Sequence, residues 1–421
     1  MAGGGARIST LDAVRGFAVM GILLMNIVDF AMPGFAYYNP SYYGGDAGAN
    51  FAAWAVNYVL FDGKMRGLFT MMFGASTVLI AERALRAGES PTRVTFARMW
   101  WLLVFGMIHV WLIWYGDILV LYSLCGMIAV VAWRWPPRRL FAVGAALLCL
   151  KLALGIAAYM SFAALERAAA EPGASAETLS EWAVMQEKLE LPSVQSQLDG
   201  YRGSYGDAFR ARIPLAVYIL TEAHLAAVPD TLALIAIGMG LFKCGFFSGG
   251  WSARSYRRVA FWSFLVCVPL HLPLIAINVE ANYHPIMLHL TEAIHLSLLR
   301  TPMTMGYAAL VILFMQRFHE SGLGQRLVAA GRMAFSNYLG TSILCTLIFN
   351  GYGLGLYGYL ERWQCYFVVI AVWAVILLWS KPWLDRFHFG PLEWLWRSLA
   401  RARLQPFAKK KEDTCPQSAN V

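Results

Sequence analysis

One histidine in the sequence lies close to a carboxylate across a short turn. His109 is near the end of an apolar stretch, and Asp117 follows it after the Tyr115-Gly116 pair. A carboxylate that accepts a hydrogen bond from a histidine ring fixes the tautomer and raises the basicity of the ring. Such a histidine can act as a general base toward a hydroxyl or an amine. A histidine inside an apolar helix can also be a hydrogen-bonded structural group, so we treat the pair as a catalytic candidate.

The first apolar stretch carries a second set of polar residues. At about 100° per residue, Asp12, Arg15, Asn26 and Asp29 fall on one stripe of a helix. Asp12 and Arg15 are three residues apart and can pair. Polar groups inside lipid cost several kcal/mol unless they face protein or water, so this stripe predicts a polar interior beside the helix. The alternative for the Asp12–Arg15 pair is that it anchors the end of the helix.

Four further residues are candidate contacts for a substrate. Tyr37 and Tyr38 lie in a loop rich in Gly, Pro and Tyr that follows the first apolar stretch. Lys151 lies in the middle of an apolar run, too deep to reach the membrane surface cheaply, so we expect it to face the protein interior and pair there. Asn337 opens another apolar run, and we expect its side chain to point into the bundle. A histidine-rich outer segment, 280–301, carries an HxxExxH pattern without a third firm ligand, and we predict no metal site.

The composition shows what must position these residues. Of the 421 residues 59% are hydrophobic and 14% are charged, whereas a soluble domain has about a quarter charged residues. This excludes a water-soluble enzyme. Long apolar runs without period-two alternation predict helices that cross a membrane. The fold class is therefore predicted to be all-α, a polytopic helical membrane bundle. We predict ten spans, at 13–30, 66–82, 98–114, 118–133, 140–162, 222–242, 259–279, 302–316, 333–350 and 364–380.

The positive charges predict the orientation of the bundle. With the N-terminus inside, 24 of the 34 Lys and Arg residues fall in cytoplasmic segments, as the positive-inside rule requires. Both termini are then cytoplasmic. The net charge of +9 is explained in this way, and we predict no nucleic-acid partner. We divide the chain into an N-terminal five-helix half (1–163), an extracytoplasmic amphipathic segment (164–213), a C-terminal five-helix half ending in a surface helix (214–400) and a basic tail (401–421). In the surface helix, Glu393 and Arg397 have the spacing of an ion pair.

Five sequence motifs carry a family resemblance. The order LDAVRGFAVMGILLMNI, KMRGLFTMMFG, GMIHVWLIWYGDIL, GRMAFSNYLGTSI and FGPLEWLWR resembles the bacterial YeiB-like membrane proteins over residues 7–400. The opening LDxxRG is also similar to the wider transmembrane acyltransferase group, which includes heparan-α-glucosaminide N-acetyltransferases and glycan O-acyltransferases. That resemblance implies a helical bundle of the bacterial cytoplasmic membrane that takes acyl-CoA from the cytoplasm and acylates an acceptor at the outer face. The chain departs from these groups because it has Asn26 where the O-acyltransferases have a histidine, and no histidine before His109.

These observations together favour an integral membrane acyltransferase. The expected partners are membrane lipids, acyl-CoA (acetyl-CoA above all) and a glycan or lipid-linked acceptor, and the sequence leaves a homo-oligomer open. The predicted site residues are His109, Asn26 and Asp117 for catalysis, Arg15, Asp12 and Arg98 for the acyl-CoA, and Tyr37, Tyr38, Lys151 and Asn337 for the acceptor. Two alternatives are a transporter of a small polar solute and a non-catalytic membrane scaffold.

Overall fold

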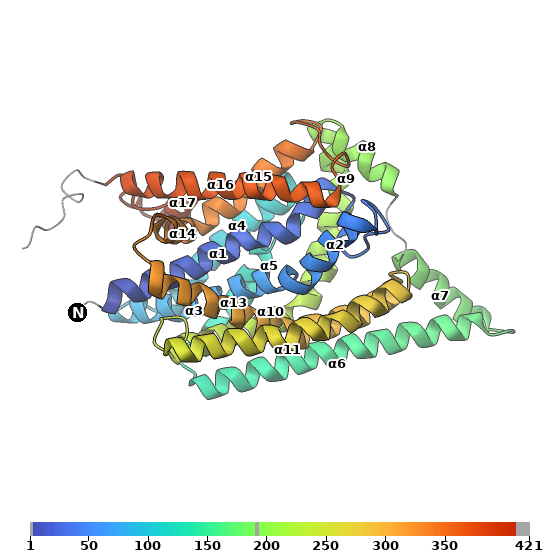
Figure 1. Cartoon of the computed structure of the whole chain (residues 1–421), viewed down its shortest axis with the longest axis horizontal. Coiled ribbons are helices and arrows are strands. Elements are labelled where there is room, and N and C mark those ends of the chain that lie inside the picture. The colour runs from blue at the N-terminus through green and yellow to red at the C-terminus, as the bar shows by residue number, and fades with distance from the viewer. Residues whose placement is uncertain (1–2, 190–192, 410–421) are drawn as a thin grey trace, which may run out of the picture.

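The computed structural model describes residues 3–189 and 193–409, and helices make up its architecture (Figure 1). The described residues contain no β-strand, only an isolated bridge between Phe387 and Ala408. In the first 170 residues the helices are α1 (Gly3–Ala31), η1 (Gly34–Tyr37), α2 (Gly48–Val56), η2 (Asn57–Phe61), α3 (Lys64–Arg86), α4 (Pro91–Ile108), η3 (His109–Ile113), α5 (Leu119–Ala129), η4 (Val130–Ala132) and α6 (Pro137–Ala170).

The remaining helices complete the bundle. They are α7 (Ala176–Leu189), α8 (Val194–Arg202), α9 (Tyr205–Tyr218), η5 (Ile219–Ala223), α10 (His224–Lys243), α11 (Ala253–Glu280), α12 (Pro285–Ile294), η6 (His295–Leu299), α13 (Arg300–Phe318), α14 (Gly322–Arg332), α15 (Ala334–Phe349), α16 (Arg362–Arg386) and α17 (Pro391–Ala400). The last part of the predicted basic tail, 410–421, lies outside the described residues.

The ten predicted spans correspond to apolar helices in the described chain. Eight helical stretches are long and apolar enough to cross a membrane, and two shorter apolar helices, Leu119–Ala132 and Ala334–Phe349, account for the other two. The protein is therefore an all-α, multi-pass membrane bundle, as the sequence predicts.

Helix α1 lies at the centre of this bundle. Of its apolar window 78% is buried, against 11% for α6, which lies at one edge. Figure 1 shows α1 between α15 and α16 on one side and α11 and α6 on the other. The start of α1 and helix α17 lie at one end of the molecule, and α7 and α8 lie at the opposite end. The start of α1 is the predicted cytoplasmic end, which places α17 on that side.

The outer segments are more ordered than the sequence indicates. The Tyr-rich loop contains η1 and α2, and the predicted outer segment 280–301 contains α12 and η6, which lead directly into α13. One turn of π-helix follows an α-helix at four places, η2, η3, η5 and η6. A π-turn inserts an extra residue and redirects the side chains beside it, and such turns are frequent at functional sites. Here the turns η3 and η6 begin at His109 and His295.

Close helix contacts at glycines hold α1 against α14. A Cβ atom on Gly331 would overlap the carbonyl oxygen of Asp12, and one on Gly16 would overlap the carbonyl oxygen of Leu327. Small residues of this kind let two helix backbones approach in a membrane. The contact also fixes Asp12 and Arg15 relative to α14.

We expect Gly331→Ala to destabilise the protein although alanine favours a helix. The added methyl group must push the two backbones apart, which costs on the order of 1–3 kcal/mol or more. The control is Gly322→Ala in the same helix, where a Cβ meets nothing within 4 Å and the change in stability should stay within about 0.5 kcal/mol. Thermal unfolding of the purified variants in detergent measures both effects, and equal unfolding temperatures would contradict the prediction.

Candidate functional site

A cavity of about 670 Å³ opens among α1, α3, α4, α15 and α17 at the predicted cytoplasmic end. Its lining changes along its depth. The mouth contains six arginines, namely Arg15, Arg83, Arg98, Arg332, Arg397 and Arg401, together with His388. The inner end is formed by apolar and aromatic side chains, namely Phe69, Phe73, Met99, Leu102, Leu119, Tyr122, Phe335 and Tyr338. A cavity of this kind suits a ligand with an anionic head and an apolar tail.

The arginines at the mouth are only partly satisfied by the protein. Arg15 donates to Asp12 at 2.8 Å and to Ser76 at 2.8 Å, so the predicted Asp12–Arg15 pair is confirmed. The guanidinium of Arg98 stacks on the Trp396 ring at 4.2 Å. In the part of the chain that the structure describes, the Nε atoms of Arg98 and Arg397 are buried without a hydrogen-bond partner.

The positive charges at the mouth also repel one another. Burial lowers the pKa of Arg397, and the nearby guanidiniums of Arg15, Arg83 and Arg401 lower it further, against the opposite effect of Glu393. Buried donors of like charge that lack a partner are stabilised by an anion, and an arginine fork matches the oxygens of a phosphate. The mouth is therefore a candidate phosphate site.

Helix α17 forms one wall of the cavity and is fastened to α15. The expectation that Glu393 pairs with Arg397 is wrong. The Glu393 carboxylate instead accepts hydrogen bonds from the backbone N–H groups of Phe335 (2.7 Å) and Ser336 (3.1 Å) and from the Ser336 hydroxyl. These groups are the unpaired donors at the start of α15, so a carboxylate from α17 caps that helix. Burial raises the pKa of Glu393, although the hydrogen bonds from Ser336 act in the opposite direction.

The predicted contact between His109 and Asp117 is confirmed. His109 Nδ1 lies 2.7 Å from Asp117 Oδ2, and both side chains are fully buried. The other Asp117 oxygen accepts the backbone N–H of Val120 at 2.8 Å, which holds the carboxylate at the start of α5. His109 Nε2 is buried and has no hydrogen-bond partner among the described residues. The second nitrogen of an oriented histidine is therefore available for a reacting group.

His109 lies just beyond the inner end of the cavity. Its ring packs against the ring of Tyr338, with 5.3 Å between centroids, and Tyr338 itself lines the cavity. Asp12, Arg15 and Arg98 also belong to the lining, whereas His109 and Asn26 do not. Asn26 is half-buried on the outer part of α1. The polar stripe of α1 therefore lines the cavity at Asp12 and Arg15 but not at Asn26.

The predicted acceptor residues do not gather at one place. Asn337 is buried and bonded within the protein: its amide donates to Ala330 and Ser380, and its oxygen accepts from Trp379. This arrangement is structural. Lys151 pairs as expected, since it donates to the Ala226 carbonyl at 3.1 Å, but the side chain is half-buried and this contact is exposed at the edge of the bundle. The Tyr37 hydroxyl donates to Asp62, and Tyr38 is 42% exposed.

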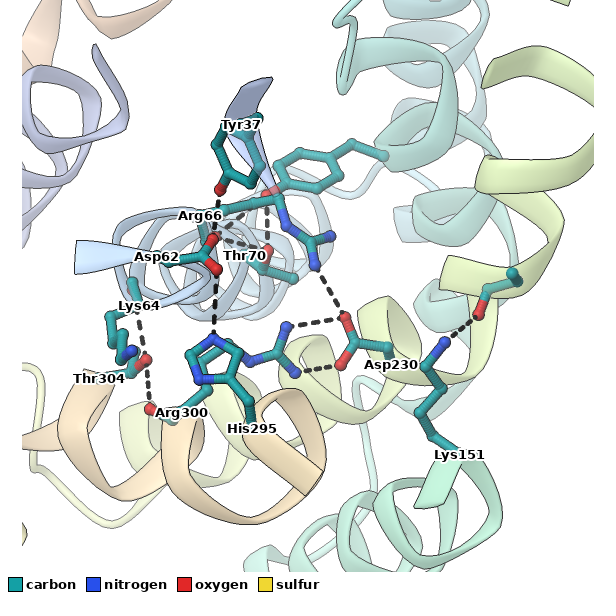
Figure 2. A network of polar contacts seen from close by, with 12 residues as sticks. Tyr37, Asp62, Lys64, Arg66, Thr70, Lys151, Asp230, His295, Arg300 and Thr304 are labelled. Carbon is teal, nitrogen blue, oxygen red and sulfur yellow. Dashed lines mark hydrogen bonds and ion pairs between the residues drawn. The ribbon is translucent and has the colours of Figure 1, made fainter. Parts of the chain in front are cut away.

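A buried polar network in the outer half was missing from the sequence analysis (Figure 2). Asp230 on α10 accepts hydrogen bonds from Arg66 at 3.2 Å and from both terminal nitrogens of Arg300, one of them at 3.0 Å. The network also contains Tyr37, which donates to Asp62, and the contacts that link Asp62, His295, His271 and Lys64. The signal was present in the run Asp62-Gly63-Lys64-Met65-Arg66. The predicted span 66–82 leaves Asp62 and Lys64 outside the bundle, whereas helix η2 and the turn at Gly63 bring both inside.

A thin layer separates this network from the cavity. The Tyr122 hydroxyl lies 2.5 Å from the Thr70 hydroxyl and 3.3 Å from the Arg66 carbonyl oxygen, while the Tyr122 ring lines the cavity. The guanidinium of Arg66 belongs to the outer network. The cavity from the cytoplasmic end and the polar network from the outer end therefore meet at Tyr122, Thr70 and Arg66.

Comparison with known proteins agrees with the five motifs. The chain is 31% identical to the uncharacterized protein YeiB of Escherichia coli K12 over 403 residues, which cover 95% of this chain and 98% of the relative. The chain belongs to the YeiB-like family. It is 30% identical to the uncharacterized protein YxaH of Bacillus subtilis 168, with 96% of each chain covered. It is also 25% identical to a 39.9 kDa protein encoded beside an amylase gene of Bacillus acidopullulyticus. A family model described as a protein of unknown function (DUF418) matches residues 241–403.

The three relatives named are bacterial proteins, and each aligns with nearly the whole chain. The matched region of the family model, 241–403, includes α15 and α17, which form part of the cavity wall. The relatives carry no named activity, so the chemistry has to be argued from the site.

Proposed function

We propose that this YeiB-like protein is an acyltransferase of the bacterial cytoplasmic membrane that uses acyl-CoA from the cytoplasm. The observation that carries the proposal is the cavity with an arginine mouth and an apolar inner end that stops beside His109. Acyl-CoA has the matching order of groups, with phosphates at one end and a long uncharged pantetheine arm that leads to the thioester and the acyl group at the other.

The residues of the cavity have separate roles in this proposal. Arg15, Arg98 and Arg397 bind the phosphates through charge-assisted hydrogen bonds. Asp12 holds Arg15 in place. The inner aromatic residues direct the thioester toward the layer formed by Tyr122 and Tyr338.

His109 and Asp117 supply the acid–base chemistry. Nε2 of His109 takes the proton of the acceptor hydroxyl or amine as the oxygen or nitrogen attacks the thioester carbonyl. The carbon–sulfur bond then breaks, and the CoA thiolate takes the proton. Asp117 keeps the ring oriented and stabilises the imidazolium. Asn26, on the stripe of α1 that also carries Arg15, is the candidate donor to the oxyanion. The acceptor, a glycan or a lipid-linked group, approaches from the outer side.

Binding of CoA tests the first part of this proposal. Purified protein in nanodiscs should bind radiolabelled acetyl-CoA saturably, and unlabelled CoA should displace it. We expect Arg98→Gln and Arg397→Gln each to raise the Kd about tenfold or more, since each loses a charge-assisted contact.

Arg254→Gln is the matched control, because Arg254 is exposed on the same side of the bundle and outside the cavity lining. Unchanged affinity in both cavity variants would remove CoA from this site. Flux of a polar solute into proteoliposomes that does not depend on CoA would instead support transport.

A further inference from the structure

The outer polar network contains two proton acceptors that face each other without a proton donor. Asp62 Oδ2 and His295 Nε2 are 3.6 Å apart, too far for a direct hydrogen bond (Figure 2). The His295 side chain is 0% exposed, and its Nε2 atom has no hydrogen-bond partner among the described residues. Leaving a buried polar atom unpaired is costly, so a donor group is needed between the two.

In a neutral His295 ring, the neighbouring side chains make Nε2 an acceptor. His271 Nδ1 lies 2.6 Å from the Cys267 carbonyl oxygen, which can only accept, so Nδ1 is a donor. The other nitrogen of the neutral ring, Nε2, is then an acceptor, and the Lys64 amine lies 3.1 Å from it. His295 Nδ1, at 3.0 Å from the same atom, must then be a donor. A neutral ring with its proton on Nδ1 has a lone pair on Nε2, and this lone pair faces Asp62. The second Asp62 oxygen already accepts the Tyr37 hydroxyl.

The tyrosine beside Asp62 does not supply a second proton. Burial, strengthened by the Asp62 carboxylate, raises the pKa of Tyr37 well above its usual value, so the phenol stays neutral. Its one hydroxyl proton goes to Asp62 Oδ1. A group that bridges Asp62 and His295 has to bring its own protons from outside the protein.

The network contains as many carboxylates as cations, but only one of the carboxylates, that of Asp230, forms an ion pair with a Lys or Arg. Four cations lie in it, and each is already bonded elsewhere: Arg66 and Arg300 to Asp230, Lys64 to the Tyr58 carbonyl and His271, and Lys151 to the Ala226 carbonyl. The Asp62 carboxylate interacts electrostatically with those of Asp29 and Glu292, and within the described chain no Lys or Arg forms an ion pair with any of the three.

The carboxylates around the site are partly exposed. Asp62 is 16% exposed, and Asp29 and Glu292 are half-buried. Tyr38, which interacts electrostatically with both Glu292 and Asp62, is 42% exposed at the surface of this region. Aromatic faces beside carboxylates favour cations over neutral or anionic groups.

We propose that Asp62 and His295, with Asp29 and Glu292 around them, form a binding site for the primary ammonium group of a small molecule or lipid headgroup. An ammonium carries enough protons to donate to both Asp62 and His295, and its charge is stabilised by the unpaired carboxylates. The inference deepens the proposed function, because it makes an amine the acceptor class, but binding at the site does not depend on acyl transfer.

Binding of ethanolamine in the absence of CoA tests this proposal. The full chain is reconstituted in phosphatidylcholine nanodiscs, whose headgroup has no N–H, and thermal unfolding is followed as solute is added. We expect ethanolamine to raise the unfolding temperature saturably. Ethylene glycol, which has a hydroxyl in place of the ammonium, and choline, which has the charge without N–H groups, should have no such effect.

Variants distinguish this site from nonspecific stabilisation. Asp62→Asn and Glu292→Gln should each weaken ethanolamine binding, by roughly 30-fold for Asp62→Asn, because a buried charged partner is lost. Glu320→Gln, an exposed carboxylate at the other end of the molecule, is the control and should bind as wild type does. The Glu292 variant provides the test if Asp62→Asn does not fold.

Nanodiscs of phosphatidylethanolamine separate the two sources of the amine. If the headgroup fills the site, the wild type unfolds at a higher temperature than in phosphatidylcholine and added ethanolamine has no further effect. If the source is a soluble amine, ethanolamine stabilises the protein equally in both. Equal responses to ethanolamine and ethylene glycol, or wild-type affinity in both carboxylate variants, would overturn the proposal. Since CoA binding is measured separately, either proposal can fail without the other.

Discussion

Replacing His109 by glutamine should reduce acyl transfer by about 10²- to 10⁴-fold while acetyl-CoA binds as before. Glutamine is close in size to histidine but cannot accept a proton at neutral pH. His109 is fully buried against Trp114 and Tyr338, and its Nδ1 is bonded to Asp117, so Nε2 is the one atom available for chemistry. The arginine mouth of the cavity is not altered, and the Kd for acetyl-CoA should therefore change little.

The measurement is release of CoA from acetyl-CoA, with water or ethanolamine as acceptor, together with the Kd of the same preparation. His319→Gln is the matched control, because His319 is exposed at a helix end and outside the cavity lining. Asp117→Asn is informative as well. It keeps an oxygen that can accept the Val120 N–H but no longer stabilises the imidazolium, so turnover should fall while the start of α5 stays capped. Wild-type turnover in His109→Gln would exclude His109 from the mechanism.

The parts of the site that the sequence predicted are those set by local spacing. Asp12 and Arg15 meet because they are three residues apart in a helix, and His109 meets Asp117 because only a π-turn and a short loop separate them. The spans were predictable for a similar reason, since the length of an apolar run is a local property that the bilayer thickness fixes.

The parts that the sequence did not predict depend on packing between distant segments. Asp230 is 164 residues from Arg66 and 70 residues from Arg300, and nothing local in α10 indicates either partner. Glu393 has a plausible local partner in Arg397, but tertiary packing places its carboxylate at the start of α15, where several backbone donors are unpaired. Asn337 likewise meets α16 through Trp379 and Ser380, which no spacing rule in α15 could indicate.

The missing outer network also has a specific cause. A charged run beside an apolar span is normally placed outside the membrane, and Asp62 and Lys64 were treated in this way. In the structure Gly63 has a φ of 68°, which lets the chain turn directly from η2 into α3 and keeps both side chains inside. His295 is brought inward by a similar irregularity, the π-turn η6. Irregular backbone at membrane depth is tolerated where it is buried in protein. Hydropathy does not indicate where such a turn occurs, so the positions of Gly63 and η6 could not be predicted.

The largest loss of stability should come from Asp230→Ala. Asp230 is 1% exposed and accepts hydrogen bonds from two guanidinium groups, those of Arg66 and Arg300. Removing the carboxylate leaves two cations inside the bundle without an anion in contact. Breaking a buried pair in this way costs about 3–5 kcal/mol, so we expect the variant to unfold at a much lower denaturant concentration or to fail to accumulate.

A double variant separates the cost of unpaired charge from the cost of lost packing. Asp230→Ala combined with Arg300→Met removes the more deeply buried cation as well, and it should recover part of the stability lost in Asp230→Ala. The exposed pair Lys381–Asp385 supplies the surface control: Asp385→Ala should cost no more than about 0.5 kcal/mol. Unfolding in mixed micelles with increasing denaturing detergent compares the wild type, the double variant and the three single variants Asp230→Ala, Arg300→Met and Asp385→Ala. If Asp230→Ala were as stable as Asp385→Ala, the three-residue cluster would contribute no net stability. If the double variant were less stable than Asp230→Ala by the full cost of Arg300→Met alone, the two residues would not be coupled.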